Sequence, residues 1–310
     1  MLCKPAATPE PARLLINIPR VRVSLLYSRR AGASVPLDHI RRAIERQGHD
    51  LVCAVEAESN VEALLEDVPD VVVAAGGDGT IALAARTLVR RGIPLAILPL
   101  GTANNIARSL AIQGSIDDLV AAWRTAGRVP LDVGVADGAW GRQAFVEGVG
   151  AGLIPAAIAD MQTRSDGDVL RASAKVAGAI RTIGRVLSQL QPVEMTLIAD
   201  GARTSGIFLL AEVLNMRSIG PNLVFSADAT PSDGLFHVVT AGEEHRDEIG
   251  RYLQEVLVRR DAALSLPSTR ARHVTLQGTS EIHLDDDVLS ASPGRTVSMQ
   301  IDAGALEVLV

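Results

Sequence analysis

The stretch that most constrains this chain runs from Asp70 to Thr80, with the sequence DVVVAAGGDGT. An apolar run rich in β-branched residues ends there in a cluster of glycines, and a helical pattern follows from Ile81. This order predicts a buried strand, a tight turn and a helix N-terminus. Such a turn exposes backbone N–H groups at the positive end of a helix dipole. The stretch therefore predicts a loop that binds an anion such as a phosphate.

The glycines and the aspartate of this turn fit a phosphate chain that carries a metal ion. Gly76, Gly77 and Gly79 permit positive φ and leave no Cβ between a phosphate and the main chain. Asp78 alone would repel a phosphate, and a bridging Mg²⁺ removes that conflict because it prefers carboxylate and phosphate oxygens. The simpler alternative is an ordinary turn in which Asp78 or Thr80 caps the helix. The chain has neither a GxxxxGK[ST] nor a GxGxxG motif, so it is not a P-loop or a dinucleotide fingerprint.

A second loop has the same placement after the next apolar run. Residues 94–98 predict a strand, and Pro99–Arg108 (PLGTANNIAR) leads from it into a helix. Gly101 makes the turn flexible, while Thr102 and Asn104 offer neutral hydrogen-bonding groups. Taken alone, this loop is equally well an ordinary helix cap. Ligands of parallel α/β sheets lie beyond the carboxyl ends of the strands, so the two loops could hold one nucleotide from both sides.

The distribution of strand and helix patterns predicts two domains. Residues 21–136 alternate between the two and predict a Rossmann-like α/β domain with a parallel sheet. Residues 137–302 contain many short apolar segments separated by turns, which predicts a mainly antiparallel β-sandwich. Residues 303–310 are apolar enough for a last strand that returns to the first domain. Residues 1–20 contain four prolines and are expected to form a loose extension.

One helical pattern, at about Asp168–Leu190, interrupts the second domain. Arg171, Lys175, Arg181 and Arg185 fall on one side of it and apolar residues on the other. A basic amphipathic helix can lie on an anionic membrane surface. A helix that packs on the sandwich and exposes its arginines to solvent is the favoured alternative. Exposed sandwich edges often pair, so a homodimer is also open.

Composition excludes several classes of protein. The net charge of −6 argues against a general nucleic-acid binder. Cys3 and Cys53 are the only cysteines, which argues against a disulfide framework and fits a reducing compartment. The sequence has no apolar run of membrane-spanning length and no signal-peptide pattern near its start. We therefore expect a cytoplasmic protein, with peripheral contact at the inner membrane face left open.

The quoted residues resemble the diacylglycerol kinase catalytic-domain family, which includes sphingosine and ceramide kinases and bacterial lipid kinases. Val72–Thr80 matches the signature turn of that family, and Pro99–Asn104 matches its second nucleotide loop. Leu131–Gly134 matches the strand that opens its second domain. Asp228–Gly234 resembles a segment that helps to hold a structural Mg²⁺ in bacterial members. The resemblance covers most of residues 21–300.

This resemblance implies that ATP lies in a cleft between the two domains and that its γ-phosphoryl group passes to a lipid hydroxyl. The implied nucleotide-binding residues are Gly76, Gly77, Asp78, Gly79, Thr80, Gly101, Thr102 and Asn104. Asp78 would orient Mg²⁺–ATP, and Asp228 and Asp233 would be ligands of the structural Mg²⁺. Asp287 would accept the proton of the acceptor hydroxyl, so Asp78 and Asp287 are the implied catalytic residues.

The sequence departs from the family pattern at several positions. Ser28–Gly32 stands in place of Asn-Pro-x-Ser-Gly, Asn105 in place of a common aspartate, and Glu147 in place of an asparagine. The family's Asp-Gly-Glu segment supplies the carboxylate that is proposed as the general base. Here Asp287 aligns with that glutamate and is one methylene shorter, and Asp286 replaces the glycine.

Three functions remain open on these grounds. The first is an ATP- and Mg²⁺-dependent lipid kinase acting on a diacylglycerol-like lipid. The second is a kinase of a soluble substrate, such as an NAD kinase, which shares the Gly-Gly-Asp-Gly-Thr turn; the glycine-rich Asn-Leu-Gly loop of those enzymes is absent from this sequence. The third is a nucleotide-binding module that has lost turnover, as the departures from the family pattern would allow.

Overall fold

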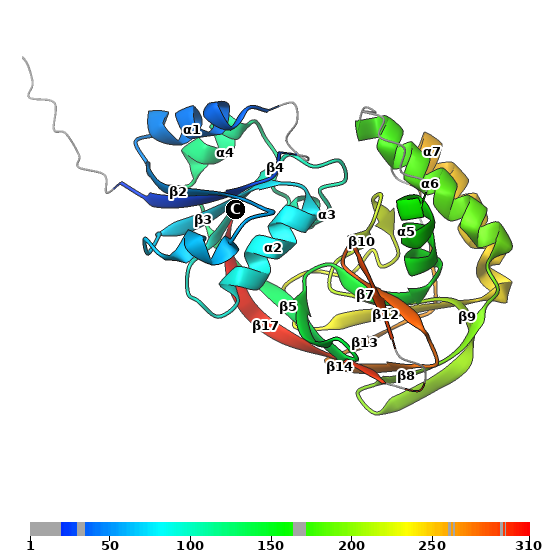
Figure 1. The fold of residues 1–310 in the computed structure, drawn as a ribbon. Helices are drawn as coiled ribbons and strands as arrows, with labels where there is room; N and C mark the ends of the chain where they lie inside the picture. Colours follow the sequence, from blue (N-terminus) through cyan, green and yellow to red (C-terminus); the bar gives the residue numbers. More distant parts are fainter. Residues whose placement is uncertain are drawn as a thin grey trace, which may run out of the picture.

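The computed structural model describes residues 20–29, 35–163, 172–259, 262, 264–291, 294 and 296–310. The extension predicted for residues 1–20 lies outside these residues except for Arg20, and Arg171 of the predicted basic helix lies outside them too. Figure 1 shows an α/β part beside a larger part built of antiparallel strands and three helices. The predicted fold class, a parallel α/β unit with an antiparallel β-sandwich, is confirmed.

Four parallel strands form the centre of the α/β part. In spatial order they are β2 (Asp50–Glu56), β1 (Arg22–Tyr27), β3 (Val71–Gly76) and β4 (Leu95–Pro99). Helices α1 (Leu37–Arg46) and α4 (Ile116–Ala122) pack on one face, and η1 (Val61–Leu65) and α2 (Asp78–Leu88) on the other. The short helix α3 (Asn105–Ser109) follows β4.

Strand β3 shows why its sequence is an almost unbroken apolar run. Its side chains alternate between the two faces of the sheet, as the pleat of a strand requires. Val72 and Ala74 join the core beneath α2, whereas Val71, Val73 and Ala75 join the core beneath α1 and α4. Because helices cover both faces, every residue of β3 is buried. The glycine turn at the end of β3 is therefore held at a fixed place on the sheet edge.

The second part is a β-sandwich with helices on one side. Its strands are β5 (Arg128–Gly138), β6 (Gly141–Phe145), β7 (Gly148–Gly152), β8 (Val193–Ala199), β9 (Ala202–Leu214), β12 (Phe236–Gly242), β13 (Ser268–Ala271), β14 (His273–Gln277), β15 (Glu281–Leu284), β16 (Asp287–Ser290) and β17 (Val297–Leu309). A small ribbon, β10 (Ser218–Ile219) with β11 (Leu223–Val224), and the 3₁₀ turn η2 (Glu243–His245) complete it. Inward-facing side chains of these strands form one core, and a second core lies beneath the helices.

Three helices pack on the sandwich where the sequence pattern predicts one. They are α5 (Leu153–Thr163), α6 (Ala172–Gln189) and α7 (Arg246–Val258). The expectation of a single helix is therefore wrong. Helix α5 has small apolar residues on several sides, and such a run cannot be told from a buried strand by periodicity alone. None of the helices within the described residues combines the length and the apolar character needed to cross a lipid bilayer.

Two long strands connect the α/β part with the sandwich. Strand β17 pairs with β5 along most of its length and with β14 at its start. Near its end, Val308 lies opposite Leu95 of β4 in parallel pairing. Figure 1 shows β5 and β17 running side by side from one part to the other. The domain boundary predicted at residue 136 falls inside β5 and stays a prediction.

Candidate active site

The glycine turn joins β3 to α2 through Gly76 and Gly77. Gly77 is extended, with φ −89° and ψ −172°, and none of Gly76, Gly77 and Gly79 has a positive φ. The permissive backbone of glycine is therefore not what the turn uses. A Cβ at Gly76 would lie 2.4 Å from Oγ1 of Thr80, so the first glycine makes room for the threonine. At Gly79 a Cβ would have open space, with Asp286 Oδ2 nearest at 3.8 Å.

The second loop is packed directly against the first. A Cβ at Gly101 would lie only 2.4 Å from the Cα atom of Gly77. Asn104 adopts the left-handed conformation, with φ 53°, and its side chain turns back onto the loop. Its Oδ1 accepts a hydrogen bond from the backbone N–H of Gly101 at 2.9 Å, and its Nδ2 donates to the Gly101 carbonyl at 3.1 Å. Asn104 therefore fixes the shape of the loop.

Asp78 links the two loops. Its Oδ1 accepts a hydrogen bond from the backbone N–H of Ile106, in the first turn of α3, at 3.0 Å. Asp78 is a capping residue, but for α3 and not for α2, the helix on which it lies. Burial raises the pKa of Asp78, while the amides of Ile106, Asn105 and Asn104 act in the opposite direction. The carboxylate thus holds the second loop in place from the first.

A pocket of 390 Å³ opens at the carboxyl ends of β1, β3 and β4. It lies beside the glycine turn, between the sheet edge and the start of α1. Its lining includes Tyr27, Ser28, Arg29, Val35, Pro36, Leu37, Asp38, Ile40, Ala75 and Leu100. Apart from the Ser28–Gly32 departure, sequence reasoning missed these residues. The available signal was their place at the end of the first parallel strand, where ligands of such sheets bind.

The turn between β15 and β16 brings three consecutive aspartates to the same region. Asp285 adopts the left-handed conformation, with φ 50°, and its carboxylate is buried. Oδ1 accepts backbone N–H groups of Glu147 at 2.7 Å and Val146 at 3.1 Å. Oδ2 accepts from Nη2 of Arg86 on α2 at 2.6 Å. Asp285 therefore ties the sandwich to the α/β part through buried, charge-assisted hydrogen bonds.

Asp286 and Asp287 have different surroundings, although both are exposed residues. Asp286 lies at the mouth of an apolar pocket and close to Gly79 at the start of α2. Protein atoms crowd its carboxyl group, and this burial together with the charges of Asp285 and Asp78 raises the pKa of Asp286 to about 6. Asp287 opens β16, opposite Leu284, and is not among the described residues that line the pocket.

Glu147 adds a further acidic side chain to this cluster. It is 3% exposed, and its Oε1 has no hydrogen-bond partner within the described part of the chain. Burial, and then the charges of Asp78, Asp286 and Asp285, raise the pKa of Glu147 well above its usual range. Burial and the neighbouring negative charges therefore favour the protonated form of Glu147 over the carboxylate. It occupies the position where the sequence departs from the family's asparagine.

A buried histidine supports the aspartate turn from behind. The ring of His283 contacts the carbonyl oxygen of Asp285 through Nδ1 at 2.9 Å and Oε2 of Glu212 through Nε2 at 2.8 Å. Burial alone would lower the pKa of His283, but the Glu212 carboxylate outweighs it and the pKa is raised. Nδ1–H donates to the carbonyl, which fixes the backbone of the turn.

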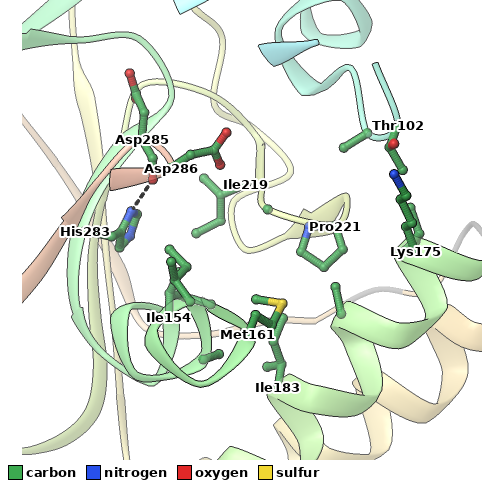
Figure 2. A pocket seen from close by; sticks show the side chains of 16 residues that line it. Thr102, Ile154, Met161, Lys175, Ile183, Ile219, Pro221, His283, Asp285 and Asp286 are labelled. Atoms are coloured by element: carbon green, nitrogen blue, oxygen red, sulfur yellow. Dashed lines mark hydrogen bonds between the residues drawn. The ribbon is translucent and has the colours of Figure 1, made fainter. Parts of the chain in front are cut away.

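The apolar pocket below the aspartate turn has a volume of 240 Å³. Figure 2 shows Ile154 and Met161 of α5, Ile183 of α6 and Ile219 around it, with Asp286 and Thr102 at its mouth. Its remaining lining includes Ala103, Ala157, Ile158, Lys175, Val176, Ala179, Gly220, Pro221, His283 and Asp285. Thr102, predicted for the nucleotide, thus also borders this pocket. Long apolar side chains with a few polar groups at one end are typical of sites for amphipathic ligands.

The residues implied as magnesium ligands lie on separate segments of the chain. Asp228 is exposed, and Asp233 lies on the turn before β12, where its Oδ1 accepts the backbone N–H of Leu235 at 3.0 Å. The described residues contain no group of three or more His, Cys, Asp or Glu side chains that could jointly hold a metal ion. The assignment of Asp78 to Mg²⁺–ATP, and of Asp228 and Asp233 to a structural Mg²⁺, stays a prediction.

Comparison with known proteins places this geometry in a family. Residues 23–136 match the diacylglycerol kinase catalytic domain. A Klebsiella pneumoniae protein named probable lipid kinase YegS-like is 30% identical, with 76% of this chain and 75% of that protein covered. A Mycobacterium tuberculosis diacylglycerol kinase is 26% identical, with 90% and 91% covered.

Solved structures agree at the level of the fold. A Bacillus anthracis structure described as a diacylglycerol kinase superposes with a TM-score of 0.69 at 19% identity. It covers 93% of this chain and 96% of that one. The family implies ATP as the co-substrate. The chain therefore belongs to the diacylglycerol kinase catalytic-domain family and is a kinase of that family.

Proposed function

We propose that this chain is an ATP- and Mg²⁺-dependent lipid kinase that phosphorylates a hydroxyl group of a diacylglycerol-like lipid. One observation carries the proposal: an apolar pocket opens onto a cluster of carboxylates at the start of α2. A lipid alcohol has the matching chemistry, because its acyl chains are apolar and its reacting group is polar. A soluble substrate such as a dinucleotide would gain little from a pocket lined by isoleucine and methionine.

The nucleotide is proposed to lie across the glycine turn. The 390 Å³ pocket beside β1 and β3 has space for a base and sugar, with Tyr27 and Leu37 in its wall. The first N–H groups of a helix lack intrahelical acceptors. In α2 the N–H groups of Thr80 and Ile81 donate to the Gly77 carbonyl, so we propose that those of Asp78 and Gly79 bind phosphate oxygens. The open space around Gly79 lets a phosphate approach that turn closely. In this arrangement the γ-phosphate points toward Asp286.

The carboxylates around the turn fit a magnesium ion that arrives with the nucleotide. Mg²⁺ is commonly held by one or two carboxylates together with substrate phosphates. Asp78 offers such oxygens, and the unpartnered Oε1 of Glu147 lies in the same cluster. When bound, the ion would neutralise charge that develops on the phosphate oxygens. Asp78 would keep the two loops together around the triphosphate through its hydrogen bond to Ile106.

Access of the lipid is proposed to occur from a membrane surface at the start of α6. Lys175 lies at the mouth of the apolar pocket, and Arg181 is exposed on the same helix. Both would be attracted to anionic headgroups. Arg185 does not contribute, because it forms an ion pair with Asp160 of α5.

The test is transfer of label from γ-labelled ATP to lipid. The protein is incubated with Mg²⁺, a total lipid extract, diacylglycerol in mixed micelles, and NAD in parallel. We expect Mg²⁺-dependent label in the lipid fraction with diacylglycerol, and its loss in Asp78→Asn. Asp137→Asn, an exposed aspartate on β5 away from the site, is the matched control and should retain transfer.

Two results would contradict the proposal. Label in NAD but not in lipid would identify a kinase of a soluble substrate. Thermal stabilisation by Mg²⁺–ATP without any labelled product would identify a nucleotide-binding module that has lost turnover. The same wild-type preparation distinguishes these cases.

A further inference from the structure

We infer that Asp286, and not Asp287, is the carboxylate that accepts the proton of the acceptor hydroxyl. This inference rests on the proposed function and assigns a residue for its chemical step. Asp287 is the aspartate that aligns with the family's glutamate, so the sequence alone assigns this role to Asp287 and not to Asp286. Three observations on the turn between β15 and β16 separate the roles of Asp285, Asp286 and Asp287.

Asp285 is committed to holding the turn. Its two carboxylate oxygens accept backbone N–H groups of Val146 and Glu147 and the guanidinium of Arg86. Its carbonyl accepts from His283, and its own N–H donates to the Gly148 carbonyl at 2.9 Å. Both carboxylate oxygens of Asp285 are thus engaged by donors of the protein itself, so this side chain serves to hold the turn.

Asp287 begins a strand outside the pocket. It pairs with Leu284 across the two-residue turn, and the next residues continue β16 as an outer strand beside β15. Successive side chains on a strand alternate in direction, so the position of Asp287 is set by the hairpin register. Among the described pocket-lining residues, Asp285 and Asp286 are present and Asp287 is not.

Asp286 occupies the place where the two substrates would meet. Its Oδ2 lies 3.8 Å from the position that a Cβ would take at Gly79, beside the proposed phosphate site. The same residue lines the mouth of the apolar pocket. In Figure 2 its carboxyl group points toward the side where Ile219 lies, whereas that of Asp285 points away. The rigid support of Asp285 by Arg86 and His283 fixes this placement, which is what orientation of a reacting group requires.

The chemical step balances with groups already named. The acceptor O–H bond breaks and its proton passes to an Asp286 oxygen, while the acceptor oxygen bonds to the γ-phosphorus. The bond from the γ-phosphorus to the β,γ-bridging oxygen breaks, and ADP leaves with that electron pair. Asp286 is solvent-exposed, so the proton then passes to water.

The experiment compares Asp286→Asn with Asp287→Asn in the full chain. With diacylglycerol in mixed micelles and labelled ATP, Asp286→Asn should lower kcat by about 10²-fold or more, the usual worth of a general base. The Mg²⁺–ATP-induced rise in melting temperature should remain. Asp287 is exposed, and the kcat of Asp287→Asn should stay within about threefold of the wild-type kcat.

Two further measurements distinguish loss of the general base from loss of structure in the variants. Asp286→Gly is accepted by a two-residue hairpin turn and should be as inactive as Asp286→Asn. The kcat of wild type should rise with pH as the general base loses its proton, and this limb should be missing from the residual activity of Asp286→Asn. The inference is overturned if Asp287→Asn loses as much kcat as Asp286→Asn, or if Asp286→Asn keeps wild-type activity. Wild type that labels no lipid at all instead refutes the proposed function, and with it this step.

Discussion

At the scale of single residues, Asp78 has a structural contact that its proposed role beside the nucleotide does not reveal. Its carboxylate caps α3 through the N–H of Ile106 at 3.0 Å and so joins the two loops. An amide at this position keeps an oxygen acceptor but lacks the charge that would attract Mg²⁺. An alanine has neither. Comparing the two substitutions therefore distinguishes the structural role of the Asp78 hydrogen bond from the role of its charge.

For Asp78→Ala we expect a loss of about 1–2 kcal/mol in unfolding free energy, the usual cost of removing a helix cap. The unfolding free energy of Asp78→Asn should lie within a few tenths of a kcal/mol of the wild-type value, because its side-chain oxygen can still accept the hydrogen bond. Both variants should lose phosphoryl transfer. Urea denaturation without nucleotide, with Asp137→Asn as control, measures the first effect. Equal stability of all three variants would show that the Ile106 contact contributes nothing.

Glu147 predicts a pH dependence of stability. Its folded-state pKa is raised well above the value of 4.5 expected for the unfolded chain, chiefly by burial. Above pH 4.5 the unfolded chain releases this proton while the folded protein retains it, so rising pH favours unfolding. The loss is at most about 1.4 kcal/mol per pH unit for one group and stops above the folded pKa.

Glu147→Gln removes the titrating group, so its stability relative to wild type should increase as pH rises above 4.5. Urea denaturation in EDTA, without nucleotide, between about pH 5 and pH 8 measures this difference. Glu281→Gln, at an exposed position on β15, is the matched control and should show no such trend. A difference that shrinks with pH would mean that Glu147 is ionised in the folded protein.

At the scale of elements, the glycine turn and the second loop use their glycines differently. Gly101→Ala would place a Cβ 2.4 Å from the Cα of Gly77, so the loops must separate. Gly79→Ala would meet nothing closer than 3.8 Å, and it replaces a glycine in the first turn of α2. An overlap between two backbones cannot be relieved by a rotamer change, whereas an added methyl group in open space is accommodated.

We therefore expect Gly101→Ala to lower the melting temperature in the absence of ligands. Gly79→Ala should keep it or raise the unfolding free energy by up to about 1 kcal/mol, the helix preference of alanine over glycine. If phosphate binds to the amides of this turn, Gly79→Ala should also lose the stabilisation by Mg²⁺–ATP. Differential scanning fluorimetry with and without Mg²⁺–ATP tests both statements. If Mg²⁺–ATP raises the melting temperature of Gly79→Ala as much as that of wild type, phosphate does not bind at the start of α2.

At the scale of the whole molecule, the pairing of β5 with β17 extends from one part to the other, with one irregularity between Asp302 and Leu306. Leu306 lies opposite Leu131 of β5, is 4% exposed, and packs in the core beneath α2. The same strand begins in the sandwich, where Val297 and Met299 are buried. A destabilising substitution near the end of β17 should therefore lower the stability of both parts.

Leu306→Ala should lower the unfolding free energy by about 2–5 kcal/mol, as for other truncated core leucines. Because β17 belongs to both parts, the transition should move to lower temperature as a whole. Val310→Ala, at a position 45% exposed on the same end of the chain, should change stability by less than about 0.5 kcal/mol. Calorimetry that resolves two separate transitions, with only one shifted in Leu306→Ala, would show that the parts unfold independently.

The sequence by itself determined the strand, turn and helix around residues 70–88 and the alternation that makes the first part a parallel sheet. These features depend on local patterning, since β-branched runs, glycines and helical spacing act on neighbouring residues. It also determined that the second part consists mainly of short antiparallel strands. It did not separate α5 from a strand, because the small apolar residues of that segment satisfy both patterns.

Only the tertiary structure decided which acidic residue faces which partner. Asp285, Asp286 and Asp287 are identical in chemistry and adjacent in sequence, and their roles differ because the hairpin register and Arg86, 199 residues away, orient the turn. Asp78 likewise became a cap for α3 only when the second loop packed against the first. Contacts between distant segments set these environments, and a local pattern of residues carries no information about them.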